Sequence, residues 1–174
     1  MDVAAVYTEF YSRIPPLCRL AVEGLDRETL ARQVGPDTNP IGWLVWHLAR
    51  VQDHHVSEVL EAPQLYVDEG WWVRFGREPE ADDVGFGADA DAVGEFDPVS
   101  ANLLLEYLDA VHTRTTRFLA TLTADDLDRV VDRNWDPPVT LGVRLVSVAD
   151  DALQHAGQAL YVRGMVDDGW RFPA

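Results

Sequence analysis

Apolar residues recur every three or four positions along four long stretches of the chain, and turns bearing proline or glycine separate them. This period is typical of helices that bury one face. The four stretches begin near Asp2, Pro40, Pro98 and Thr140. No stretch shows the convincing alternation of a strand. The sequence therefore predicts an all-α four-helix bundle made by a single domain, residues 1–174.

The start of each predicted helix carries a recognisable signal. Pro15 and Pro16 should kink or restart the first helix. Asn39, Asp97 and Thr140 are the expected caps of the second, third and fourth helices, since their side chains can accept a backbone N–H. The first helix should bury one apolar face: Val3, Val6, Tyr7, Phe10 and Ile14. The second should bury a longer stripe: Ile41, Leu44, Leu48, Val51, His55 and Val59.

The segment between the second and third helices, residues 61–97, is too long for a plain connection. It contains several glycines and many acids, and its large aromatic residues include Trp71, Trp72, Phe75 and Phe86. We interpret it as a lid or side layer with a short helix. A middle crossover loop of this length also permits the second and third helices to be joined in a non-trivial way.

The last helix raises a question of chemistry, because a histidine lies in its inward seam. That seam alternates steps of four and three: Leu141, Leu145, Val148, Ala152, His155, Ala159 and Val162. Asp151 precedes His155 by one turn, so the two side chains share a face about 6 Å apart along the axis. A buried acid is costly unless it is paired or binds a metal. The pair could hold one ion, although this spacing alone is common by chance.

A further ligand for such an ion must come from another helix. His47, at the edge of the buried stripe of the second helix, is the best candidate. His54 lies about 10 Å further along that axis, too far to share the ion easily. His55 could be a core histidine with a satisfied hydrogen bond, and His112 has no acidic partner on its own face.

Two segments together resemble a known family. NPIGWLVWHLARVQDHH (39–55) and QHAGQALYVRG (154–164) are similar to the second-helix and last-helix motifs of the DinB-like superfamily of metal-binding four-helix bundles. The family's metal ligands fall on His47, Asp151 and His155. Asp151 stands where the family usually has His or Glu, and its side chain is one methylene shorter than Glu. The resemblance implies a divalent metal, zinc for preference, and mycothiol as a co-substrate.

Two histidines and one carboxylate leave a coordination position open, as in catalytic metal sites. With the resemblance, this favours a thiol S-transferase-like enzyme that activates a low-molecular-weight thiol for attack on a small electrophile. Gln158 and Arg163 are candidate ligand-binding residues, although Arg163 equally suits the negative end of its helix. The alternatives are a metal-dependent hydrolase, a non-catalytic metal-binding or stress-related protein that forms a homodimer, and a metal-free network of buried hydrogen bonds.

Composition narrows the partners and the compartment. A formal net charge of −16 repels phosphate groups, so we expect neither nucleic acid nor an anionic membrane surface as a partner. We also see no apolar run of the roughly 20 residues that span a bilayer, and no secretory signal. The single cysteine, Cys18, rules out an internal disulfide and fits the cytoplasm. The chain has no lysine, which excludes Schiff-base chemistry.

Overall fold

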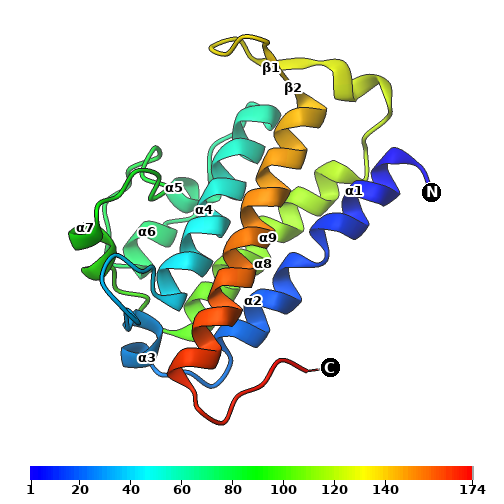
Figure 1. Ribbon diagram of the computed structural model, residues 1–174. Helices are drawn as coiled ribbons and strands as arrows, with labels where there is room; N and C mark the ends of the chain where they lie inside the picture. The colour runs from blue at the N-terminus through cyan, green and yellow to red at the C-terminus, as the bar shows by residue number, and fades with distance from the viewer. Residues whose placement is uncertain (174) are drawn as a thin grey trace.

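Four long helical arms build the computed structural model, which describes residues 1–173 (Figure 1). The first arm consists of α1 (Val3–Tyr11) and α2 (Ile14–Val22), and the other three are α4 (Ile41–Leu60), α8 (Ala101–Leu119) and α9 (Leu141–Val166). The short elements are α3 (Arg27–Ala31), α5 (Leu65–Asp68), α6 (Trp71–Arg74), α7 (Ala90–Gly94), the 3-10 helix η1 (Asp125–Asp128), β1 (Val130–Asp132) and β2 (Val139–Thr140). The predicted four-helix bundle is confirmed. None of the described helices combines the length and apolar character that a membrane crossing requires.

The order of the arms places α9 against both α2 and α4, while α8 packs on α1, α2 and α4. In Figure 1, α4 and α8 run in the same direction, opposite to the first arm and to α9. The chain between α4 and α8 must therefore travel back along the bundle before α8 can begin. This return is the long crossover that the sequence predicted.

The first arm restarts at Ile14 with a proline in the first turn of α2, as expected. Its buried face differs from the prediction, because Val6 and Phe10 are exposed. Tyr7 and Tyr11 set the face instead. Their hydroxyls donate to the carbonyl oxygens of residues 142 and 145 at the start of α9, at 3.3 and 2.8 Å. Because these bonds hold Tyr7 and Tyr11 against α9, Val6 and Phe10 face solvent.

Two of the three predicted caps are wrong. α4 begins after Pro40, which has no side-chain donor or acceptor, and Asn39 lies one residue outside the capping position. Ser100, not Asp97, caps α8, because the Asp97 carboxylate pairs with α3 and accepts a backbone N–H within its own turn. Thr140 caps α9 as predicted, accepting from the backbone N–H three residues on.

A short hairpin precedes α9, whereas no strand was predicted. β1 and β2 pair antiparallel with an irregular register, Val130 opposite Thr140 and Asp132 opposite Val139. Strands of three and two residues are too short to show a period of two. The hairpin contacts α9 through the Asp132 carboxylate, which accepts a hydrogen bond from Arg144.

The 61–97 segment forms a side layer of short helices beside α4, as interpreted from the sequence (Figure 1). Three of its aromatic residues pack around Tyr107 of α8. The ring centroids of Tyr66, Trp71 and Phe75 lie 5.8, 5.3 and 5.9 Å from that of Tyr107. All four rings are buried, so the side layer extends the apolar core of the bundle.

Arg50 of α4 is fully buried and holds the backbone of the side layer. Its guanidinium donates to the carbonyl oxygens of residues 81 and 83 at 2.9 and 3.2 Å, and to the Gln64 amide oxygen at 2.8 Å. It also lies 3.9 Å above the Tyr66 ring. A buried cation needs such partners, because an unpaired one is very costly. The loop carbonyls are therefore fixed against α4.

Asp53, one turn further, is also fully buried and is the anionic counterpart. It accepts the backbone N–H groups of Leu65 and Tyr66 at 3.1 and 2.8 Å, the Tyr107 hydroxyl at 2.8 Å, and a bond from Arg114. The start of α5 and the middle of α8 are thereby tied to one carboxylate.

Gly85 lies where the loop approaches α4 closely. Its φ of +82° favours glycine, and a Cβ there would lie 2.9 Å from Trp43, 3.1 Å from Trp46 and 3.2 Å from His47 Nδ1. Gly87, two residues on, has a φ of +74° but open space around the same position. Only Gly85 is needed for close approach as well as for backbone conformation.

Replacing Asp53 with Ala should lower the free energy of unfolding by about 3–5 kcal/mol, because two arginines would lose their buried anion. The measurement is urea unfolding followed by circular dichroism. Glu106→Ala is the control, since Glu106 forms an exposed ion pair with Arg74 and should cost no more than about 0.5 kcal/mol. Equal losses in the two variants would contradict the role given to Asp53.

Gly85→Ala should destabilise the protein more than Gly87→Ala. Both substitutions put a Cβ into a left-handed backbone, at a cost of about 1–2 kcal/mol. Only Gly85→Ala adds a clash with two tryptophans, worth about 1–3 kcal/mol more. Urea unfolding of the two single variants measures the difference, and a larger loss in Gly87→Ala would show that the close approach is not a constraint.

Candidate metal centre

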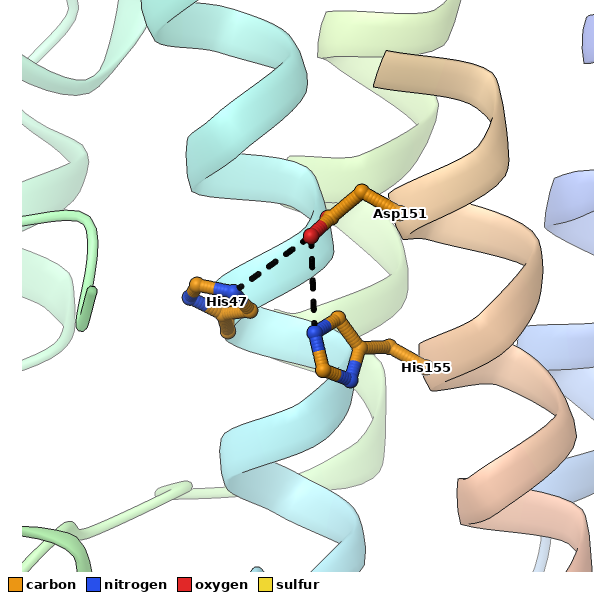
Figure 2. A group of neighbouring side chains, drawn as sticks. All are labelled: His47, Asp151 and His155. Atoms are coloured by element: carbon orange, nitrogen blue, oxygen red, sulfur yellow. Dashed lines mark ion pairs between the residues drawn. The ribbon is translucent and has the colours of Figure 1, made fainter. Parts of the chain in front are cut away.

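Three potential metal ligands from two helices converge in the structure: His47 of α4, and Asp151 and His155 of α9. Figure 2 shows the two imidazoles turned toward one carboxylate oxygen. Asp151 Oδ1 lies 4.0 Å from His47 Nε2 and 3.5 Å from His155 Nε2. The residues that the sequence singled out as ligands are thus brought together, because α4 and α9 pack side by side.

The His47 ring is held from two sides. Its side chain is buried, and it stacks on Trp43 with ring centroids 4.6 Å apart and planes 9° apart. Its Nδ1 bonds to the Val84 carbonyl oxygen of the side layer. Since a carbonyl oxygen only accepts, Nδ1 carries the proton and Nε2 carries the lone pair that faces Asp151.

His155 has the same arrangement by a different route. Its Nδ1 lies 2.8 Å from the Gln158 amide oxygen, one turn on along α9. That oxygen accepts the Nδ1 proton and leaves the lone pair on Nε2, which faces Asp151. Oxygen acceptors behind the imidazoles, as at both histidines here, are typical of metal-binding histidines, where they fix the tautomer and the ring orientation.

The remaining oxygen of Asp151 also fits a cation. Asp151 Oδ2 is inaccessible to solvent and has no hydrogen-bond partner within residues 1–173. Two imidazole lone pairs and a carboxylate therefore face each other with no hydrogen atom between them. Such a group repels itself unless a proton or a metal ion lies inside it.

The spacing of the three donor atoms suits an ion after a small adjustment. They all lie within 4.8 Å of one another. Ligands about 2.0–2.1 Å from a tetrahedral zinc ion are about 3.3 Å apart, so side-chain rotations of less than one rotamer step close the difference. The donor set of two nitrogens and one carboxylate oxygen is one that zinc accepts in proteins.

The two histidines differ in proton affinity. Burial lowers the pKa of His47, and the Val84 carbonyl and Asp151 oppose this without outweighing it. Burial acts on His155 in the same direction, but the Asp151 carboxylate and the Gln158 amide oxygen favour the protonated ring and outweigh it, so the pKa of His155 is raised. A proton that competes with a metal ion for this group therefore resides on His155.

The structure separates the two predicted ligand-binding residues. Gln158 lies beside the cluster and orients His155, as described above. Arg163 is buried two turns away, where its guanidinium donates to the carbonyl oxygens of Ala21 and Glu23 at the end of α2 and pairs with Asp167. This geometry gives Arg163 a structural contact between α9 and α2, and a ligand contact for it stays a prediction.

A cleft of about 550 Å³ opens on one side of the cluster, between α4, α9, the side layer and the hairpin. His47 and Asp151 line one end of it. Phe86 of the side layer and Trp135 of the hairpin also line it, and both are largely exposed. The volume suits a small molecule rather than a macromolecule.

A second group of potential ligands, His54, His55 and Glu58, lines the same cleft. From the sequence, His54 is too far from His47 to share an ion easily, and His55 is expected in the buried stripe of its helix. His55 is instead half-buried at the cleft surface. The available signal was the spacing of Glu58, which follows the two histidines by four and three residues on one helix.

Comparison with known proteins agrees with the geometry. A solved structure described as a conserved protein from Enterococcus faecalis is 29% identical, covers 95% of this chain and 98% of its own, and superposes with a TM-score of 0.88. A search of curated proteins finds no match. A family model described as the DinB superfamily matches residues 13–159, so the chain belongs to the DinB superfamily.

Proposed function

We propose that this protein is a metal-dependent, thiol S-transferase-like enzyme whose divalent ion, zinc for preference, is held by His47, Asp151 and His155. The observation that carries the proposal is the convergence of three lone-pair donors on one point beside a cleft. The substrates are a low-molecular-weight thiol, such as mycothiol, and a small electrophile.

The number of ligands supports catalysis over a purely structural role. Within the described residues, the group contains three protein ligands, whereas structural zinc is usually closed by four. The side of the group that faces the cleft is available to an outside molecule. A divalent ion held there supplies a Lewis acid, which favours the thiolate form of a bound thiol.

The protein's own thiol is a poor nucleophile. Cys18 is fully buried in the bundle core, and burial raises the pKa of its thiol to about 12. A reactive cysteine needs a low pKa and access to its partner. The nucleophile therefore has to enter from outside, which agrees with an open cleft.

The surrounding residues keep the donor atoms in place. Trp43 blocks one face of the His47 ring, and the Val84 carbonyl prevents Nδ1 from competing with Nε2 as the ligand atom. Gln158 does the same for His155. The Asp151 side chain is short, so the two imidazole rings must lie close to it. The packing of α4 against α9 brings them there.

Zinc should bind the purified protein in one equivalent and stabilise it, by about 2.7 kcal/mol at a free concentration of 100 times Kd. His155→Ala should weaken binding by more than about 100-fold, because even an outer-shell partner costs 10–100-fold. Elemental analysis and thermal unfolding with and without zinc measure both effects. Gln154→Ala, an exposed position on the same helix, is the matched control. Unchanged zinc binding in His155→Ala would refute the ligand set.

The zinc-loaded protein should consume N-acetylcysteine in the presence of 1-chloro-2,4-dinitrobenzene faster than the metal-free protein does. His47→Ala should abolish the difference, because it removes a ligand. Cys18→Ala should retain the activity, since the buried thiol takes no part. Dinitrophenyl thioether formation is followed by absorbance. Bound zinc without thiol consumption across several electrophiles would favour a non-catalytic metal-binding protein, and zinc-dependent ester cleavage without thiol would favour a hydrolase.

A further inference from the structure

The far end of the cleft holds a second polar group, built on the last turns of α4. His54, His55 and Glu58 line it there, about 10 to 16 Å along the helix axis from His47. Val51 and Val148 line the wall between the two groups. The composition of this second group, two imidazoles and a carboxylate, is the same as that of the metal centre. Its hydrogen bonds are different, and they decide what the group can do.

His54 offers no lone pair to the cleft. The Gln64 amide oxygen accepts from buried Arg50 at 2.8 Å, so the amide nitrogen of Gln64 faces His54 Nδ1 at 3.0 Å. An amide N–H₂ only donates, which makes Nδ1 the acceptor and leaves the proton on Nε2. His54 Nε2 lies 3.6 Å from the Glu58 carboxylate. A metal ion could bind His54 Nε2 only if the proton moved to Nδ1. The Gln64 amide would then have to turn its oxygen toward the ring, and Arg50 would lose that acceptor.

His55 has the opposite arrangement. Its Nδ1 lies 2.9 Å from Glu58 Oε2, and the carboxylate accepts the proton. The lone pair is therefore on Nε2, in a half-buried ring that lines the cleft. An imidazole oriented by a carboxylate through Nδ1, with Nε2 free, is the arrangement that enzymes use for a general base.

Charges around His55 favour the neutral ring. Burial lowers its pKa, the Glu58 contacts oppose this, and the positive charge of Arg144 and the neighbouring His54 add to the lowering. Arg144 of α9 lines the same end of the cleft and is anchored by Asp132 of β1 at 2.8 Å. Asp82 of the side layer and Asp132 also line the cleft. Arg144 is placed to stabilise an anion formed beside His55.

We propose that His55, oriented by Glu58 and flanked by Arg144, is a general base that acts on a protic group of the molecule bound in the cleft. His55 Nε2 takes the proton of a hydroxyl, thiol or acidic C–H group, and the electron pair stays on the substrate as an anion beside Arg144. The imidazolium is stabilised by Glu58 and returns its proton to solvent or to product. The inference rests on the proposed function only for the identity of that molecule.

Imidazole NMR of the wild-type protein tests the hydrogen bonding directly. Two-bond ¹H–¹⁵N spectra should show the proton of His55 on Nδ1 and the proton of His54 on Nε2, near pH 7.5. The two residues are adjacent in sequence, so each is the control for the other. A proton on Nε2 of His55 would overturn the proposal.

Reaction with 4-nitrophenyl acetate tests the free lone pair without requiring bound metal. His55 Nε2 attacks the ester carbonyl, 4-nitrophenolate leaves, and water then hydrolyses the acyl-imidazole. Neither lysine, which the chain lacks, nor the buried Cys18 contributes to the background. His55→Gln should lower the release of 4-nitrophenolate by at least about tenfold, since positioned bases contribute about 100-fold or more. His54→Gln, the matched control, should retain most of the reaction.

The pH dependence separates His55 from an ordinary surface histidine. The rate should rise with pH through a midpoint below 6.5, because burial disfavours the protonated ring. Glu58→Gln should move the midpoint lower still while reducing the rate, since it removes the charge that favours protonation and the acceptor that orients the ring. A midpoint at or above 6.5 in the wild type would contradict the assignment.

Zinc titration provides the last criterion. His55→Gln should leave the single zinc equivalent unchanged. A second equivalent that His55→Gln removes would make the group a metal site and overturn the proposal. Because the ester reaction is measured on metal-free protein, a failure of the proposed function would show as absent zinc binding, with the His55 reaction intact.

Discussion

The burial of Arg50 and Asp53 side by side on α4 is the constraint on which the rest of the site depends. Charged groups without water need several partners each, and here the side layer supplies them as backbone carbonyl and N–H groups. The loop is consequently held against α4 by main-chain contacts. Val84 follows Asp83 in the chain and its carbonyl oxygen contacts the ring of His47, so the loop becomes part of the candidate metal centre.

The two histidine–carboxylate groups of the cleft show that composition does not determine chemistry. At His47 and His155, oxygen acceptors behind the rings direct both lone pairs inward, toward a carboxylate. At His54 an amide nitrogen stands behind the ring and reverses the tautomer. The inward lone pairs of the first group concentrate negative potential and suit a cation. In the second group, ring N–H groups of both histidines face the Glu58 carboxylate. Arg50 contributes to both, through the loop at one end and through an amide at the other.

The sequence was sufficient for the bundle, because long periodic stretches predict helices, although the buried face of α1 was predicted wrongly. It also singled out the three residues that converge as potential ligands, since Asp151 and His155 share a helix face and the resemblance adds His47. The Val84 contact could not be predicted, because a backbone carbonyl that arrives from 37 residues away has no side-chain signature. The capping prediction at Asp97 was wrong because an ion pair with Arg27 of α3, distant in sequence, competes with capping. Burial of His47 likewise depends in part on the loop, whose Val84 carbonyl and Gly85 lie against the ring.

The positions of the two halves of the metal centre also bear on how the protein is made. His47 emerges from the ribosome more than a hundred residues before Asp151, and Tyr11 meets its partner carbonyl at residue 145 only when the last helix exists. Until then the nascent chain exposes the faces of α2 and α4 that α9 later covers. Contacts of such long sequence separation form slowly and leave apolar surface accessible in the meantime. Synthesis of α9 is thus the event that completes both the core and the ligand set.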